Sequence, residues 1–110
     1  GIAVPKYTSS KVSAAVAAHN ANIKTLESAA SMYLVDDGTD TTWTGAATGE
    51  SWNNYLQEWP GIPKGLTKND GTTKIEPSAT YKVTISDGQI VVIPGKADDK
   101  GKVSTDPSGK

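Results

Sequence analysis

The chain has 110 residues, of which 35% are hydrophobic. It contains 11 lysines, no arginine and 12 acidic residues, which give a formal net charge of −1. A near-neutral chain has no basic surface to neutralise phosphates, so nucleic acid is not expected as a partner. The chain has no cysteine, which excludes disulfides, thiolate metal sites and a cysteine nucleophile. This length predicts one domain, whose small core must be built without phenylalanine from aliphatic residues, three tryptophans and four tyrosines.

A long helix is predicted over about residues 6–35. Apolar and aromatic residues and one histidine recur there at alternating spacings of four and three, which predicts one helical stripe facing the core. The stripe comprises Val12, Val16, His19, Ile23, Leu26, Ala30 and Tyr33. The helix should end at Asp36-Asp37-Gly38, because Gly38 can adopt the left-handed conformation and carboxylates are unfavourable at this end of the helix dipole. Pro5 lacks a backbone N–H and is interpreted as a first-turn residue or as a kink in a helix that begins upstream, and the apolar Ile2-Ala3-Val4 favours the kink.

The middle of the chain is predicted to hold a loop and a second, short helix. Residues 37–50 are rich in Gly, Thr and Asp without an apolar period, which predicts a surface loop. Within residues 51–59, a serine cap precedes aromatic and aliphatic residues spaced i, i+3, i+4 and i+7, which predicts a short amphipathic helix ended by Pro60. These residues are Ser51, Trp52, Tyr55, Leu56 and Trp59.

A small antiparallel sheet is predicted over about residues 72–94. Its clearest part is a hairpin around Asp87-Gly88, a pair typical of a two-residue type I′ turn. Counted outward from the turn, the register pairs Ser86 with Gln89, Ile85 with Ile90, Thr84 with Val91, Val83 with Val92 and Lys82 with Ile93. This register places an apolar face toward the helix, made of Tyr81, Val83, Ile85, Ile90 and Val92. A further short strand is predicted at residues 72–76.

The expected fold class is therefore α+β, with a long N-terminal helix packed on a small antiparallel sheet within residues 1–95. Residues 96–110 contain seven charged residues, and Ala97 and Val103 are their only apolar members apart from proline. So little apolar area favours a flexible C-terminal tail.

Candidate catalytic or ligand-binding residues are few. His19 has no carboxylate three or four residues away to orient it, and is interpreted as a packed or boundary residue rather than a general base. The first acidic group, Asp36, Asp37 and Asp40, lacks the spacing and the terminal glutamate of a calcium loop and is interpreted as a helix stop and solvated turn. The second acidic group, Asp98, Asp99 and Asp106, is interleaved with Lys100 and Lys102, which weaken a cation site, and is interpreted as part of a solvated tail. No serine has a recognisable base and acid, and there is no glycine-rich phosphate loop. Neither an enzyme nor a metal or cofactor site is expected.

The tryptophans leave one binding function open. Trp43, Trp52 and Trp59, with Tyr55, could form a platform on which sugar rings stack. Because Trp52, Tyr55 and Trp59 share a predicted helical face that a core without phenylalanine needs, packing in the core is the favoured interpretation.

Ile2-Ala3-Val4-Pro5-Lys6-Tyr7 resembles the stretch of type IV pilins and pseudopilins in which the apolar N-terminal helix passes into its amphipathic half. The layout that follows is also similar over most of the chain, with a long helix, a variable loop, a segment ending at Trp59-Pro60 and an antiparallel hairpin. The resemblance implies a pilin-like fold and an upstream apolar helix removed to leave a soluble fragment. Two features depart from the family: there are no cysteines to close a C-terminal loop, and residues 96–110 do not match the calcium-binding pattern of major secretion pseudopilins.

The resemblance implies a structural subunit of a type IV pilus-like filament at the cell surface, anchored in the membrane before assembly. Its implied partners are other copies of itself, other pilins and the inner-membrane assembly machinery. The implied assembly and packing helix comprises Pro5, Tyr7, Val12, Val16, Ile23, Leu26 and Tyr33. The alternatives are a pseudopilin of a type II secretion or DNA-uptake system, and a carbohydrate-binding module. Since a small sheet covers only part of a helix of about 45 Å, the N-terminal turns should project and leave Val12 and Val16 partly exposed.

Overall fold

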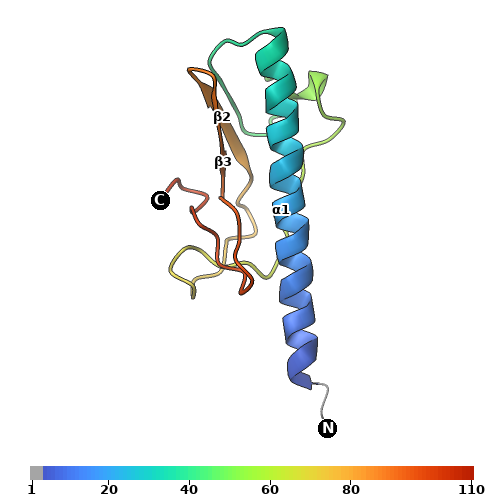
Figure 1. The fold of residues 1–110 in the computed structure, drawn as a ribbon, viewed down its shortest axis with the longest axis vertical. Coiled ribbons are helices and arrows are strands. Elements are labelled where there is room, and N and C mark those ends of the chain that lie inside the picture. The colour runs from blue at the N-terminus through green and yellow to red at the C-terminus, as the bar shows by residue number, and fades with distance from the viewer. Residues whose placement is uncertain (1–3) are drawn as a thin grey trace.

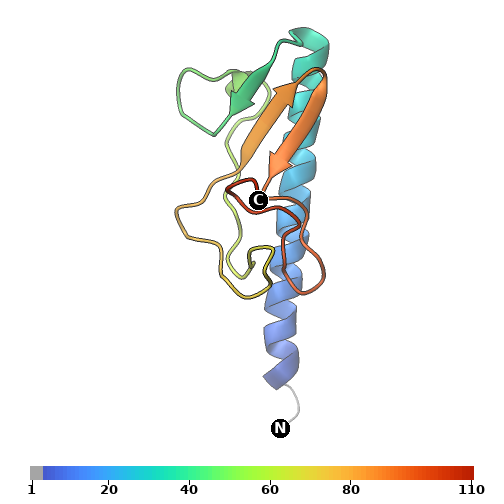
Figure 2. The same ribbon diagram turned by 90° about the vertical axis from the view of Figure 1, so that its left-hand side faces the viewer.

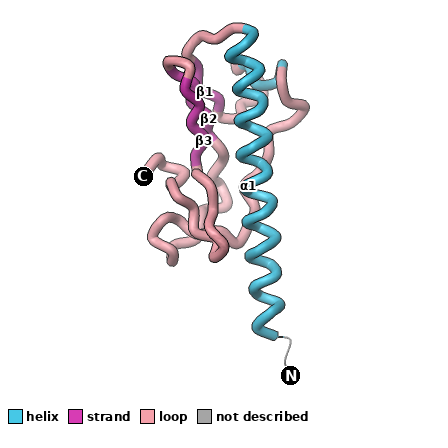
Figure 3. The backbone as a smooth tube through the Cα atoms, in the orientation of Figure 1, coloured by secondary structure: helices cyan, strands magenta, loops and turns pink. Residues whose placement is uncertain are grey.

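The computed structural model describes the backbone of residues 4–110 and the side chains of residues 11–110. A long helix, α1 (Val4–Asp36), stands beside a three-stranded antiparallel sheet (Figure 1). The sheet has the order β1-β2-β3, with β1 at Thr41–Trp43, β2 at Lys82–Ser86 and β3 at Gln89–Ile93. Loops form the rest of the body and pack beside α1 below the sheet (Figure 3). The predicted α+β class is confirmed.

The helix α1 closely follows the predicted range and ends at the predicted glycine. The N–H groups of Asp37 and Gly38 both donate to the carbonyl oxygen of Tyr33, at 2.8 and 3.1 Å. Gly38 has a φ of 78°, the left-handed conformation that this type of helix end requires. Of the predicted N-terminal residues, Pro5 lies within the first turns of α1, and its side chain and that of Tyr7 are outside the described part of the chain.

One stripe of α1 is buried against the body, as the spacing predicts. The buried members are Ala15, His19, Ile23, Leu26, Ala29, Ala30 and Tyr33. Val12 and Val16 are half-buried, in agreement with the expectation that the sheet covers only part of the helix. The upper part of this stripe meets the sheet, and Ala15 meets the C-terminal loops.

The hairpin forms with the predicted register over its whole length. Asp87 and Gly88 have φ values of 52° and 76°, which the type I′ turn needs at both positions. The side chains that face α1 are buried or half-buried: Tyr81, Val83, Ile85, Ile90 and Val92. The opposite side, which we call the outer sheet face, carries Thr42, Lys82, Thr84, Val91 and Ile93.

A strand lies inside the segment predicted to be only loop. β1 pairs with the free edge of β2, with Thr41 opposite Ile85 and Trp43 opposite Val83. Trp43 is fully buried, so one side chain fixes the strand in the core. Three residues are too few to show the alternation that identifies a strand in a sequence, which explains why the prediction missed it.

One predicted element is shorter than expected and another does not form. Instead of a helix over residues 51–59, one turn of 3₁₀ helix occupies Ser51–Asn54, and Trp52 and Trp59 meet with ring centroids 5.2 Å apart. Instead of a strand at residues 72–76, there is a turn in which the N–H groups of Thr72 and Thr73 donate to an Asp70 carboxylate oxygen, each at 2.8 Å. Such side-chain hydrogen bonds compete with a strand ladder, and only Lys74 forms an isolated bridge, with Thr67.

The predicted flexible tail is instead folded against α1 and the loop around Leu66. Val103 is fully buried, and its N–H donates to the carbonyl oxygen of Thr67 at 3.1 Å. The amide of Asn20, on α1, pairs with both backbone groups of Ala97, at 3.0 and 3.2 Å. Figure 2 shows this segment crossing in front of α1 below the sheet. Composition misled the prediction because these partners lie about 35 and 77 residues away along the chain.

Replacing Leu26 with Asp is expected to unfold the chain. The Leu26 side chain is fully buried, and an unpaired carboxylate there costs several kcal/mol against a total stability of about 5 to 15 kcal/mol. A thermal melt followed by circular dichroism measures the effect. Ser28→Asp, at an exposed position of the same helix, is the control and should melt within a few degrees of the parent. An unchanged melt for Leu26→Asp would contradict the core assignment.

Shortening Val103 tests whether the C-terminal segment contributes to stability. Val103→Ala should lower the free energy of unfolding by about 2 kcal/mol, because the lost methyl groups leave a cavity in a fully packed site. This corresponds to a fall in melting temperature of about 10 °C for a chain of this size. The exposed Lys100→Ser is the control, and a Val103→Ala melt equal to that of this control would mean that the segment is not packed.

Candidate functional site

The assembly helix implied by the sequence is divided by the fold into a packed part and a projecting part. Ile23, Leu26 and Tyr33 are buried inside the body, so they hold the body together and offer no surface to a partner. Val12 lies at the lower rim of the body, where a Cβ added to Gly101 would come within 3.3 Å of its Cγ1. Below this level the turns of α1 project beyond the sheet and loops (Figure 1).

His19 connects α1 to two other segments through its ring nitrogens. Its Nε2 lies 2.7 Å from the carbonyl oxygen of Gly95, and its Nδ1 lies 2.7 Å from the hydroxyl of Tyr81. A carbonyl oxygen only accepts, so Nε2 carries the proton and Nδ1 accepts from the Tyr81 hydroxyl. The two rings are also stacked, with centroids 5.5 Å apart. The neutral imidazole is therefore fully hydrogen-bonded.

Burial keeps His19 in this neutral form. The side chain has no exposed surface, and this desolvation lowers its pKa, while the hydrogen bond to Gly95 partly opposes the shift. The prediction of a packed residue is confirmed, but both partners were missed. They lie 62 and 76 residues along the chain, so no local pattern could have indicated them.

The aromatic residues form part of the core rather than a flat platform. Trp43 and Trp52 are buried, and their indole N–H groups donate within the body, to the Ser51 hydroxyl at 3.0 Å and to the Ala46 carbonyl oxygen at 2.9 Å. Trp59 is half-buried and lies so close to Gly45 that an added Cβ would be 2.5 Å from the indole ring. Sugar stacking needs open ring faces, so these contacts favour the core interpretation.

The first acidic group of the sequence is dispersed over three separate contacts. Asp36 accepts a hydrogen bond from the Tyr55 hydroxyl at 2.8 Å, and Asp40 accepts one from the backbone N–H of Asp87 at 3.1 Å. Asp37 accepts from the Thr39 hydroxyl at 2.6 Å. Each carboxylate thus closes its own turn or loop.

Two members of the second acidic group, Asp98 and Asp106, also accept hydrogen bonds from the backbone of loops. Asp98 accepts from the N–H groups of Lys102 and Lys100 at 3.0 and 2.9 Å, and these bonds hold the pKa of Asp98 below its usual value. Asp106 accepts from the N–H of Asn69 at 2.7 Å. Among the side chains of residues 11–110, no group of three or more from histidine, cysteine and the acidic residues is placed to hold a metal ion.

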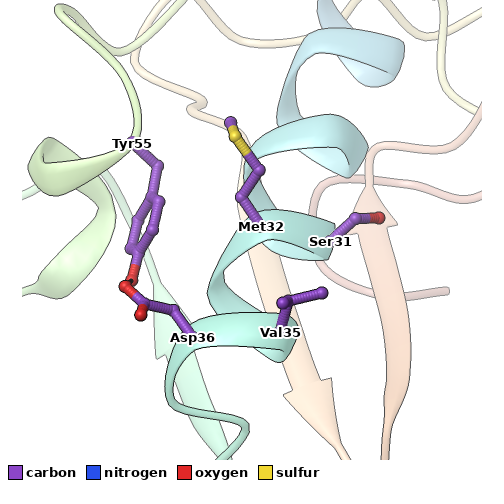
Figure 4. Close-up of a pocket in the computed structure, with 5 residues that line it drawn as sticks. All are labelled: Ser31, Met32, Val35, Asp36 and Tyr55. Atoms are coloured by element: carbon purple, nitrogen blue, oxygen red, sulfur yellow. Dashed lines mark hydrogen bonds between the residues drawn. The ribbon is translucent and has the colours of Figure 1, made fainter.

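A shallow groove of about 490 Å³ lies beside the last turns of α1, and no pattern in the sequence indicates it. We call it the α1-end groove; its lining residues are Ser31, Met32, Val35, Asp36 and Tyr55 (Figure 4). Val35 is 90% exposed and Met32 is 51% exposed, because both lie off the buried stripe. The hydrogen bond between Tyr55 and Asp36 closes one side of the groove and raises the pKa of the Tyr55 hydroxyl.

No helix among the described residues is long and apolar enough to span a bilayer. Comparison of the chain with protein-family models, with curated proteins and with solved structures found no match.

The stability of the chain should depend on pH through His19. Its pKa in the folded state lies below the ordinary value of 6.5 that the unfolded chain is expected to have. The unfolded state therefore binds more protons between these two values. Stability from His19 is complete above about pH 6.5 and falls as the pH decreases through this window, with a slope of at most about 1.4 kcal/mol per pH unit.

Urea unfolding at several pH values measures this slope, and His19→Gln is the matched control. Glutamine retains a side-chain N–H for the Gly95 carbonyl but does not titrate, so the variant should lose the His19 part of the pH dependence while the carboxylates still contribute. Equal slopes in parent and variant between pH 5 and about 6.5 would contradict the buried neutral imidazole.

Proposed function

We propose that this chain is a structural subunit of an extracellular filament of the type IV pilus kind, held in the filament by the N-terminal part of α1. The observation that carries the proposal is the length of α1 relative to the body. Its 33 residues correspond to about 50 Å, whereas the buried residues among positions 11–36, whose side chains the structure describes, lie between Ala15 and Tyr33. Figure 2 shows the earlier turns projecting below the sheet and loops.

The outward surface of α1 supports packing between helices. Ala14, Ala17, Ala18 and Ala21 are exposed and follow the spacing i, i+3, i+4 and i+7, so they share one face. Small side chains allow a second helix to approach closely, and covering them removes apolar surface from water. After Pro5, α1 contains neither proline nor glycine, which suits a straight rod shared between neighbouring subunits.

The way the body is attached to α1 also suits a load-bearing subunit. His19 and Asn20 bind the backbone at Gly95 and Ala97, so the segment that follows β3 is tied to the middle of the helix. The chain has no cysteine with which to form a disulfide. These hydrogen bonds and the buried Val103 therefore hold the C-terminal segment on the body. Such a subunit needs no catalytic group; its partners are other copies, other pilins and the membrane-bound assembly machinery.

Immunogold electron microscopy with antibodies raised against this chain tests the proposal. Cells that express the gene should carry surface filaments labelled along their length, and deletion of the gene should remove them. Label confined to the cell envelope, with a defect in protein secretion or DNA uptake, would replace the proposal with the pseudopilin alternative. Soluble, filament-free protein that binds sugars would overturn it in favour of a carbohydrate-binding module.

A pair of matched variants separates assembly from folding. Ala14→Glu places a charge on the exposed alanine face, and Ser28→Glu places the same charge on an exposed position further along α1. Both should melt within about 2 °C of the parent, because exposed substitutions change stability little. In deletion cells, Ala14→Glu should abolish the labelled filaments, while Ser28→Glu should restore them. Filaments of normal abundance with Ala14→Glu would contradict assembly through this part of α1.

A further inference from the structure

Three large hydrophobic side chains are more than half exposed among the described residues. Met32 and Val35 lie in the α1-end groove, and Val91 lies on the outer sheet face, where it is 54% exposed. Single exposed hydrophobic residues need no explanation, but the pair in the groove lines it together with Tyr55 (Figure 4).

The two surfaces have opposite charge. The groove contains Asp36, and the exposed Asp37 follows it. On the outer sheet face, Lys82 is exposed and stands directly opposite Ile93 in the hairpin, two pairs along from the pair that contains Val91. An apolar groove beside a carboxylate is therefore complementary to a sheet face that presents one exposed valine beside an ammonium group.

The two surfaces also face different sides of the molecule. In Figure 1 the sheet stands to one side of α1, and the 3₁₀ turn that leads into Tyr55 stands to the other. The side chains that fill the space between sheet and helix belong to the inner face, so Val91 and Lys82 point away from α1. A contact between the groove of one copy and the outer sheet face of the next would leave the sheet face of the first copy and the groove of the second copy free.

We propose that the α1-end groove binds the outer sheet face of a second copy of this chain, with Val91 against Met32 and Val35 and with Lys82 near Asp36. Such a head-to-tail contact does not close on itself and propagates into a linear array. The inference rests on the proposed filament. A contact made by a few side chains on each surface is weak in dilute solution, and it becomes stronger when neighbouring copies are already held together.

Cysteine cross-linking tests the contact, since the chain contributes no thiol of its own. Purified Val35→Cys and Val91→Cys chains, of different mass through a tag, are mixed at millimolar concentration and oxidised. Random collision gives mixed dimers as half of the product. We expect mixed dimers to exceed the sum of the two homodimers at least fivefold, and the double variant to give a ladder of oligomers. Lys82→Glu, added to the Val91→Cys chain, should reduce the yield at least threefold.

Thr48→Cys, in an exposed loop outside both surfaces, is the control and should give a statistical mixture with Val91→Cys. The proposal is overturned if Val35→Cys and Val91→Cys behave like this control, or if homodimers of Val35→Cys dominate. Concentration-dependent amide shifts confined to the two surfaces in the unsubstituted chain should agree with the cross-links, and their absence would also overturn it.

The same cysteine pair in isolated filaments keeps this inference separate from the proposed function. If labelled filaments carry Val35→Cys and Val91→Cys but these two positions do not cross-link, the filament role stands and the proposed contact is rejected. A ladder from the purified chain, together with cells that carry no labelled filament, would retain the contact and remove the filament role.

Discussion

The structure depends on how one stripe of α1 is covered by two separate apolar clusters with a polar joint between them. Ile23 and the residues above it pack on the sheet, and Ala15 packs with Leu66 and Val103 from the loops. His19 lies between these clusters on the same stripe, fully buried, where an unpaired polar group would cost free energy. Its two hydrogen bonds remove that cost and tie the clusters into one body.

A chain with few apolar residues can form this body because its loops satisfy their own backbone groups. Glu50 accepts hydrogen bonds from the N–H groups of Thr44, Gly45 and Ala46 at 2.9 to 3.2 Å and from the Thr44 hydroxyl at 2.7 Å. Burial alone would raise the pKa of Glu50, but the hydroxyl bond and the backbone bonds together lower it below its usual value. Asp98 serves the loop before Val103 in the same way. Capping by carboxylates thus replaces strand ladders where the sequence has too little apolar surface to build more sheet.

The sequence predicts those parts of the fold that depend on residues close together along the chain. The stripe of α1, its end at Gly38 and the register around Asp87-Gly88 each depend on neighbours a few residues away. β1 and the C-terminal segment depend on partners tens of residues distant, so composition alone suggested loop and tail. The candidate surfaces follow the same rule: the packed residues of α1 were predictable from spacing, whereas the α1-end groove arises only when Tyr55 is brought beside Asp36.

The two contacts proposed for this chain lie toward opposite ends of a single helix, which makes them mechanically dependent. Ala14 and the alanines near it lie low on α1, and Val35 lies at its last turn, about 30 Å away at 1.5 Å per residue. A helix without internal proline or glycine transmits a rotation at one end to the other with little bending. The packing angle between helices would therefore fix where each α1-end groove meets its neighbour's sheet, so that a change in either contact alters the pitch of the whole array.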